Sequence, residues 1–295
     1  MEIKSISLKE HTGQYMTSLP QDLSLQGSTI WLHDLRTVSR YLKTPTPLMK
    51  LSYNLIIHIT EGKFYGQVEA DSLEIGANSV LFITEGRIIA RKKMSKNIRG
   101  YCMIINNVTL SKMLSNDNLL SLFEINPVIH VSDESNEWLK TAYGLLDKEL
   151  TKSESNNKIA DLLLQAVLQK LLATSDSDHT FTRERKVAFQ FRKKAHQNFI
   201  DQKDLSFYAR QLAVSKNYLT RCVKNTFETP PKKMLLKMSI LHAQLLLQDF
   251  SKQISEVAFE LNYNDPSYFG RIFKQITRQT PSEYRDSLMQ DLSEY

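Results

Sequence analysis

The sequence has little of several features that mark particular protein classes. Its 295 residues include only two cysteines, Cys102 and Cys222, which lie too far apart to suggest a disulfide-stapled secreted fold. Apolar residues make up 41% of the chain, yet no run of them approaches the roughly 18 residues that a membrane-spanning helix needs. The N-terminal stretch, MEIKSISLKEHTGQ, has no apolar core of signal-peptide length. These absences favour a soluble protein of the reducing cytoplasm.

The motifs of common enzyme chemistry are also missing. The sequence has no GxGxxG or Walker-type loop, no HExxH pair and no credible pairing of a nucleophile with a base. It has no His-x-His pair, and the histidines of the N-terminal half lack the spacing of metal ligands: His11, His33, His58 and His130. We therefore expect no catalytic site, no metal site and no cofactor.

Positive charge is concentrated in the C-terminal part of the chain. The whole sequence has 38 Lys and Arg and 32 Asp and Glu, a net charge of +6. Residues 183–295 contain 19 basic and 12 acidic residues, a net charge of +7, whereas residues 1–182 contain 19 basic and 20 acidic residues, a net charge of −1. A basic excess confined to one region is the electrostatic footprint expected of a DNA-binding domain.

Residues 254–285 have the pattern of a helix-turn-helix motif. Apolar residues between positions 254 and 261 fall at helical spacing, and the break at 262–264 contains two Asn, which tolerate the left-handed backbone of a sharp turn. A second helix begins around Pro266, where a missing N–H costs nothing, and it is apolar on one face and basic on the other. Such a helix can enter the major groove of DNA, although an ordinary helical pair with a solvated basic face has the same pattern.

The pattern occurs twice, and the repetition favours DNA binding. Residues 207–225 align with residues 256–275, with one extra residue in the second turn. Both copies have an arginine on the exposed face of the second helix and a lysine one turn later: Arg221 and Lys224, then Arg271 and Lys274. Arginine can bind a guanine edge with two hydrogen bonds, and lysine suits a phosphate.

One long helix is predicted between the two copies. Residues 231–247 are continuously helical in character and would span roughly 25 Å at about 1.5 Å per residue. With a motif at each end of this helix, the two second helices would lie about one turn of DNA apart, roughly 34 Å. A single chain could then contact two successive segments of the major groove.

This arrangement resembles the AraC/XylS family of transcriptional regulators over residues 186–287. The motif VAFELNYNDPSYFGRIFKQITRQTPSEYR is similar to that family's signature almost position by position. The resemblance implies that the paired motifs bind double-stranded DNA, that the N-terminal domain senses an effector or dimerises, and that the regulator is an activator. It also implies which residues of the second helices contact DNA: Lys216, Asn217, Thr220, Arg221, Lys224, Pro266, Ser267, Gly270, Arg271 and Lys274.

The sequence departs from the family pattern at a few positions. The family usually has Gly in both turns, where this chain has Ala213 and Asn262. Because a left-handed Ala costs on the order of 1 kcal/mol, we expect the first turn to be reshaped. Pro266 and Gly270 offer no hydrogen-bonding side chain, so the second helix should read fewer base edges. Ser239 stands where an Arg is common, which predicts the loss of one phosphate or structural contact.

Residues 28–109 have the composition of β structure. Short segments rich in Ile, Val, Tyr and Phe alternate with turn residues, and the expected strands are 53–59, 63–68, 79–83, 87–90 and 100–106. Such a series predicts a sandwich or small barrel. In an AraC-like protein it resembles a cupin-type jelly roll, and IGANSVLFI resembles the strand-entry turn of that fold.

Residues 134–173 predict a helical hairpin with its turn at 151–157. Apolar stripes run along both helices, and we expect either that the hairpin closes the barrel or that it forms a dimer contact. The residues expected at such a contact are Leu145, Leu163, Val167 and Leu171. The polar stretch that follows, 174–182, reads as a linker.

The strands supply candidates for an effector site. His58, Tyr65 and Tyr101 fall on predicted strands, and Arg87 or Arg91 could offer charge to a carboxylate or phosphate. The same residues are also explained by aromatic core packing and by a solvated basic loop. The sequence therefore leaves open whether a polar or anionic effector exists.

These observations predict an α+β protein with an N-terminal cupin-like β jelly roll and helical hairpin and a C-terminal all-α domain with two helix-turn-helix motifs. We expect a sensor or dimerisation domain at 1–175, a linker at 176–185 and the DNA-binding domain at 186–290. The expected partners are double-stranded DNA, a small polar or anionic effector, RNA polymerase and a second copy of the chain. Two alternatives remain: an architectural DNA-binding protein of low specificity, and a regulator controlled by a protein partner without an effector.

Overall fold

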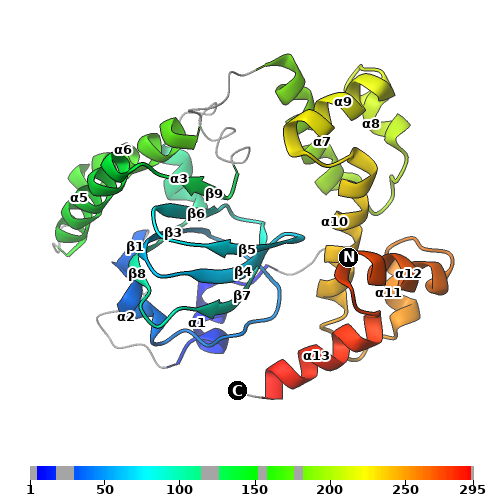
Figure 1. Cartoon of the computed structure of the whole chain (residues 1–295), viewed down its shortest axis with the longest axis horizontal. Helices are drawn as coiled ribbons and strands as arrows, with labels where there is room; N and C mark the ends of the chain where they lie inside the picture. The colour runs from blue at the N-terminus through cyan, green and yellow to red at the C-terminus, as the bar shows by residue number, and fades with distance from the viewer. Residues whose placement is uncertain (1–4, 18–29, 114–125, 152–157, 176–181, 294–295) are drawn as a thin grey trace. The chain divides into compact units, whose positions relative to one another are not determined.

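The computed structural model describes residues 5–17, 30–113, 126–151, 158–175 and 182–293. The chain forms two compact units, Met1–His179 and Thr180–Tyr295, and Figure 1 shows the elements of each. Most of the predicted linker, residues 176–181, and the predicted hairpin turn at 152–157 lie outside the described residues.

Two antiparallel sheets make up the β part of the first unit. One has the strand order β1-β8-β3-β6-β9 and the other the order β2-β7-β4-β5. The strands of the larger sheet are β1 (Ile30–Asp34), β8 (Arg99–Ile105), β3 (Asn54–Glu61), β6 (Ser79–Ile83) and β9 (Val128–His130). Those of the smaller sheet are β2 (Met49–Lys50), β7 (Ile88–Met94), β4 (Phe64–Val68) and β5 (Asp71–Ile75). The predicted jelly-roll architecture is confirmed, with β1, β2, β5 and β9 in addition to the expected strands.

Each strand of the larger sheet faces two different apolar cores. Successive side chains of a strand point to opposite faces, so Ile57 and Cys102 lie in the core between the sheets. Ile56 and Met103, one position away from them, lie in a second core on the other face. Two helices flank the core between the sheets, α1 (Leu8–Tyr15) and α2 (Leu35–Ser39).

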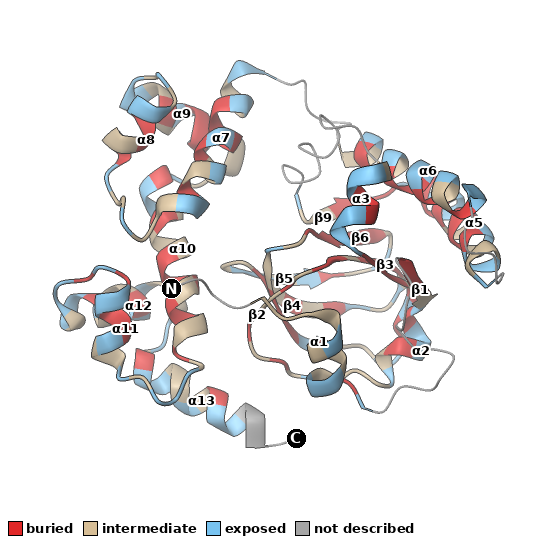
Figure 2. Ribbon diagram, turned by 180° about the vertical axis from the view of Figure 1, so that it is seen from behind, coloured by how far each residue is buried: buried red, intermediate tan, exposed pale blue. Residues whose placement is uncertain are grey.

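Within the described ranges, three helices cover the outer face of the larger sheet. They are α3 (Asn107–Met113), α5 (Asp133–Leu150) and α6 (Lys158–Ser175). Figure 2 shows that α5 and α6 are buried along one side and exposed along the other. The expected dimer stripe is wrong in part, because Val167 and Leu171 are fully buried in this core and Leu163 packs against it. Covering a five-stranded sheet requires a wider apolar face than closing a small barrel.

The second unit is all-helical and has two separate cores. Its helices are α7 (Arg183–Asn198), α8 (Leu205–Gln211), α9 (Lys216–Phe227), α10 (Pro231–Leu246), α11 (Ile254–Glu260), α12 (Pro266–Thr277) and α13 (Pro281–Ser293). Figure 1 shows α10 between the group α7 to α9 and the group α11 to α12. Leu235 of α10 belongs to the first core, whereas Ile240 and Ala243 belong to the second. The predicted connecting helix is thus confirmed, and so is the predicted α+β class.

Among the helices of the described ranges, none is both long enough and apolar enough to cross a membrane.

Candidate nucleic-acid interface

The turn of the first motif lies between α8 and α9. Ala213 has a φ of 52°, in the left-handed region, and its N–H donates to the carbonyl of Arg210 at 3.1 Å. The N–H of Val214 donates to the carbonyl of Ala209 at 3.0 Å. These two bonds satisfy carbonyls at the C-terminus of α8, as helix-ending left-handed residues do.

The turn of the second motif has the same geometry. Asn262 has a φ of 55°, and its N–H donates to the carbonyl of Phe259 at 2.9 Å. The N–H of Tyr263 donates to the carbonyl of Ala258, also at 2.9 Å. The expectation that Ala213 reshapes the first turn is therefore wrong, because Ala213 adopts the same left-handed conformation that Asn262 adopts in the second turn.

Helix α9 presents the predicted residues of the first motif on its outer face. The hydroxyl of Ser215 caps the helix by accepting from the N–H of Tyr218 at 3.1 Å. Leu219, Cys222 and Val223 are fully buried in the first core, which turns the opposite side of α9 outward. Four predicted residues are exposed there: Lys216, Asn217, Arg221 and Lys224. Thr220 is half-buried, and its hydroxyl donates to the carbonyl of Lys216 at 2.8 Å.

Helix α12 presents the second set in the same way. Asp265 caps it by accepting from the N–H of Ser267 at 2.8 Å. Phe269 and Phe273 are fully buried in the second core. The outward residues are Ser267, Arg271 and Lys274, which are exposed, and Pro266 and Gly270, which are half-buried. A Cβ added at Gly270 would meet no atom within 4 Å, so this position is an open part of the surface.

Two side chains that the sequence did not suggest accompany the exposed arginines. The carboxylate of Glu184 in α7 lies 3.0 Å from the guanidinium of Arg221, and it also accepts from the amide of Asn225 at 3.5 Å. In the second motif, the ring of the exposed Tyr268 lies 5.8 Å from the guanidinium carbon of Arg271. Nothing in the periodicity of α7 marks Glu184, whereas Tyr268 stands on the predicted outer face next to Ser267.

A groove of about 610 Å³ lies beside α12 in the second unit. Basic and aromatic side chains from α10, α12 and the preceding loops share its lining: Lys203, Lys232, Tyr263, Tyr268 and Arg271. Ser239 also lines it and is hydrogen-bonded to the hydroxyl of Tyr263 at 3.1 Å. This buried serine thus makes a structural contact of its own, and the loss of the contact that an Arg would make stays a prediction.

The candidate effector residues of the first unit do not share one site. His58 and Tyr101 lie on the helix-covered face of the larger sheet, near Tyr143 of α5, with the His58 and Tyr143 ring centroids 5.7 Å apart. Burial lowers the pKa of His58 to about 4, and a contact with Asn136 opposes that shift. Tyr65 is half-exposed on the smaller sheet, and Arg87 is half-buried at the turn before β7. Only Arg91 lines a cavity between the sheets.

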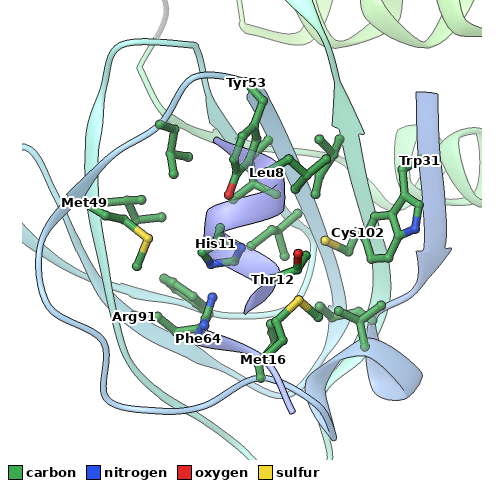
Figure 3. A pocket seen from close by; sticks show the side chains of 18 of the residues that line it. Leu8, His11, Thr12, Met16, Trp31, Met49, Tyr53, Phe64, Arg91 and Cys102 are labelled. Carbon is green, nitrogen blue, oxygen red and sulfur yellow. The ribbon is translucent and has the colours of Figure 1, made fainter. Parts of the chain in front are cut away.

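That cavity has a volume of about 40 Å³ and is lined mainly by apolar side chains. Figure 3 shows His11 of α1 in the middle of the lining, with Tyr53 and Arg91 near it. The guanidinium of Arg91 donates to the carbonyl of Lys43 at 3.1 Å and to that of Tyr15 at 3.4 Å. Burial and then the charge of Arg91 lower the pKa of His11 to about 3. Because α1 was not predicted, the sequence did not place His11 in a site.

Several known proteins are similar to this chain. A family profile described as a helix-turn-helix domain matches residues 208–287. The HTH-type transcriptional activator RhaR of Mannheimia succiniciproducens is 21% identical over 258 residues, which are 83% of this chain and 89% of RhaR. The uncharacterized HTH-type transcriptional regulator YijO of Escherichia coli is 29% identical over 106 residues, which are 34% of this chain and 38% of YijO. Among solved structures, unsaturated fatty acid bound ToxT from Vibrio cholerae is 13% identical, with a TM-score of 0.44 and coverage of 87% of this chain and 94% of ToxT.

The matched profile spans both motifs, from α8 to α13, and therefore covers the two exposed helix faces described above. RhaR and YijO are regulators of the helix-turn-helix type, and so is a second activator, RhaS, at 26% identity over 141 residues. Two such motifs with matching turns, joined by one helix and preceded by a jelly-roll unit, are the arrangement that the sequence resembles. Residues 208–287 thus match a helix-turn-helix domain, and the chain is similar to transcriptional activators of the AraC type.

Proposed function

We propose that this protein activates transcription by binding double-stranded DNA in two successive segments of the major groove, one through α9 and one through α12. One observation carries the proposal: the two helices share the same turn geometry and expose the same Arg–Lys pair, while each packs on its own core. Activation is supported by the names of the relatives RhaR and RhaS.

The exposed residues divide into two roles by their chemistry. Arg221 and Arg271 can each bind a guanine edge with two hydrogen bonds, and Asn217 can do the same for adenine. Ser267 and Thr220 can offer a hydroxyl to a base or a phosphate. Lys216, Lys224 and Lys274 suit phosphates. Pro266 and Gly270 carry no hydrogen-bonding side chain, and their small outer surface lets the backbone of α12 approach the base edges.

Selection of binding sites from a random DNA pool tests this function. We expect the full chain to enrich a bipartite site whose two halves lie about 10–10.5 base pairs apart, with affinity falling steeply as salt rises. An architectural protein of low specificity would bind the pool without enriching any sequence, and that result would refute the proposal.

We also propose that the first unit forms a homodimer through the outer side of α5 and α6. Large apolar side chains remain exposed there, namely Trp138, Leu145, Ile159 and Leu162, at 40–57% of their full accessibility. Light scattering of the full chain should give the mass of a dimer, and Leu145→Glu with Leu162→Glu should give a monomer that remains folded, because neither residue is in the core. A wild-type monomer at tens of micromolar would contradict this part of the proposal.

The cavity beside Arg91 is the place where we propose an effector binds. The charge of Arg91 and the ring of His11 suit a carboxylate or another polar group, and the remaining lining suits a short apolar body. A volume of about 40 Å³ holds roughly three water molecules, so any larger effector requires α1 to move. The small volume equally supports the alternative of a regulator controlled by a protein partner.

Thermal unfolding of the full chain with a series of short carboxylic acids separates these two possibilities. An effector that binds near Arg91 should raise the unfolding temperature of wild type and leave Arg91→Met unchanged. If no acid, polar metabolite or amide shifts the wild-type transition, control by a partner protein is the better account. In either case an activator must also meet RNA polymerase, and we propose that it does so on DNA in the cytoplasm.

A further inference from the structure

A loop of the first motif reaches the turn of the second motif. This loop, residues 199–203, follows α7 and is called the bridge below. The ammonium group of Lys203 donates to the carbonyl of Leu261 at 2.7 Å and to that of Asn262 at 3.0 Å. The same ammonium lies 3.7 Å from the centre of the Tyr263 ring. One side chain of the bridge therefore contacts three successive residues of the second turn.

The second turn also reaches back to the bridge. The side-chain amide of Asn262 donates to the carboxylate of Asp201 at 3.0 Å and to the carbonyl of Ile200 at 3.4 Å. The side chain of Ile200 packs against the core of the second motif, whereas its neighbour Phe199 packs against the core of the first. The bridge thus joins the two cores by apolar packing as well as by hydrogen bonds.

The chemistry of the bridge and of the second turn explains why a lysine stands at position 203 and an asparagine at position 262. The carbonyls of Leu261 and Asn262 lie at the C-terminal end of α11, where helix carbonyls lack intrahelical donors and the helix dipole is negative. A lysine ammonium donates hydrogen bonds to these carbonyls and places a positive charge at the negative end of the helix. Asn262 adopts the left-handed conformation that the turn requires, and unlike a glycine it offers an amide for the bridge. The corresponding residue of the first turn, Ala213, has no such group.

We propose that Lys203 and Asn262 are positioning residues that fix α9 and α12 at the spacing and angle needed to enter both segments of the major groove. This inference rests on the proposed function, in which both helices bind DNA. The two motifs have separate cores, and both α10 and the bridge connect them. Rigid linkage makes the second binding event intramolecular at a high effective concentration, and loosening it lowers affinity without removing any DNA contact.

The test compares full sites with half-sites in the full-length protein. The variants are Lys203→Met, which keeps the length of the side chain, and Asn262→Gly, which keeps the left-handed turn but removes the amide. We expect each variant to lose roughly tenfold in affinity for the bipartite site and to keep wild-type affinity for a site with either half scrambled. The variants should also discriminate less against a site with one extra base pair between its halves.

Matched controls distinguish positioning from direct contact with DNA. Arg271→Ala should weaken the full site and the half-site of α12 alike. Lys232→Met removes a charge that lines the same groove as Lys203 and should leave the ratio of full-site to half-site affinity unchanged. Lys203→Met could instead lower the slope of log affinity against log salt concentration by about one and weaken binding to a half-site. Lys203 would then be a phosphate ligand, and the inference would be overturned.

Two further outcomes are decisive. If both variants stay folded, as checked by thermal unfolding, and keep the wild-type ratio of full-site to half-site affinity, the bridge does not position the helices. If wild type itself shows no preference for a bipartite site, the proposed function fails first and the inference fails with it. Since the first result is a property of the variants and the second of wild type, the two failures are distinguishable.

Discussion

The guanidinium of Arg221, which we assign to base recognition, lies 3.0 Å from the carboxylate of Glu184 in α7. Both side chains are substantially exposed, so this ion pair adds little to stability. Its consequence is for binding, because the carboxylate occupies donors that a guanine edge would take. In the proposed complex Arg221 would therefore exchange Glu184 for the base when DNA binds.

Replacing the two cationic residues of α9 should separate base from backbone recognition. Arg221→Ala should cost about 1–3 kcal/mol on the selected site and relax preference at one base pair, whereas Lys224→Ala should weaken all sequences alike. Fluorescence anisotropy with the selected site, its single-base variants and random DNA measures both effects. Equal losses on specific and random DNA for both variants would show that the assigned roles are wrong.

Removing the competing carboxylate should strengthen binding. Glu184→Gln keeps the shape of the side chain but frees Arg221 and deletes a negative charge near the DNA. We expect affinity for the selected site to rise by roughly two- to fivefold, the range that an exposed ion pair allows. Glu228→Gln, a change of the same charge at the exposed C-terminus of α9, serves as the control. The same gain from both variants would indicate a general charge effect rather than competition for Arg221.

The left-handed Ala213 predicts a stabilising substitution. Ala213→Gly should raise the free energy of unfolding of the second unit by about 0.5–1 kcal/mol, because glycine adopts a φ of 52° without a steric penalty while adding only modest chain entropy to the unfolded state. Ala188→Gly in α7 should instead lower the free energy of unfolding, since that alanine is helical and buried. Urea titration of the full chain measures both. A destabilised Ala213→Gly variant would contradict the strain argument.

The glycine in the middle of α12 predicts a substitution that raises stability and weakens DNA binding. Gly270→Ala should stabilise the second unit by about 0.5–1 kcal/mol, because the site is helical and an added Cβ meets nothing within 4 Å. If α12 approaches base edges closely at this point, the same variant should bind the selected site less tightly. Unchanged affinity would show that Gly270 does not face the DNA.

Sequence patterns could predict the second unit more completely than the first. The helix-turn-helix pairs are local, so periodicity and turn residues were enough to place α9 and α12 and their exposed faces. The bridge was not predictable, because Lys203 and Asn262 are 59 positions apart and only tertiary packing brings them together. The same applies to Arg221 and Glu184, which are on different helices.

In the first unit, the sequence shows that side chains alternate between the two faces of each strand. It does not show which face lies between the sheets and which face is covered by helices. His58 and Tyr101 stood on predicted strands, yet a period of two cannot tell a barrel interior from a face covered by helices. The helix α1, which brings His11 beside Arg91, is short and polar and gave no apolar periodicity. For these reasons the sequence grouped five candidate effector residues that the fold distributes over several places.

The buried histidine beneath α5 predicts a loss of stability in acid. In the folded chain the pKa of His58 is lowered to about 4 by burial, whereas an unfolded histidine titrates near 6.5. The folded state therefore binds fewer protons than the unfolded state between these values, so stability is full above pH 6.5 and is lost as the pH falls toward 4. His58→Phe should make the unfolding temperature of the first unit less sensitive to pH over this window. His11, with a pKa of about 3, remains in the variant, so part of the dependence of the unfolding temperature on pH remains as well. Differential scanning calorimetry of both proteins at pH 7 and pH 5 measures the difference, and a pH dependence identical to that of wild type would mean that His58 is not the group that titrates.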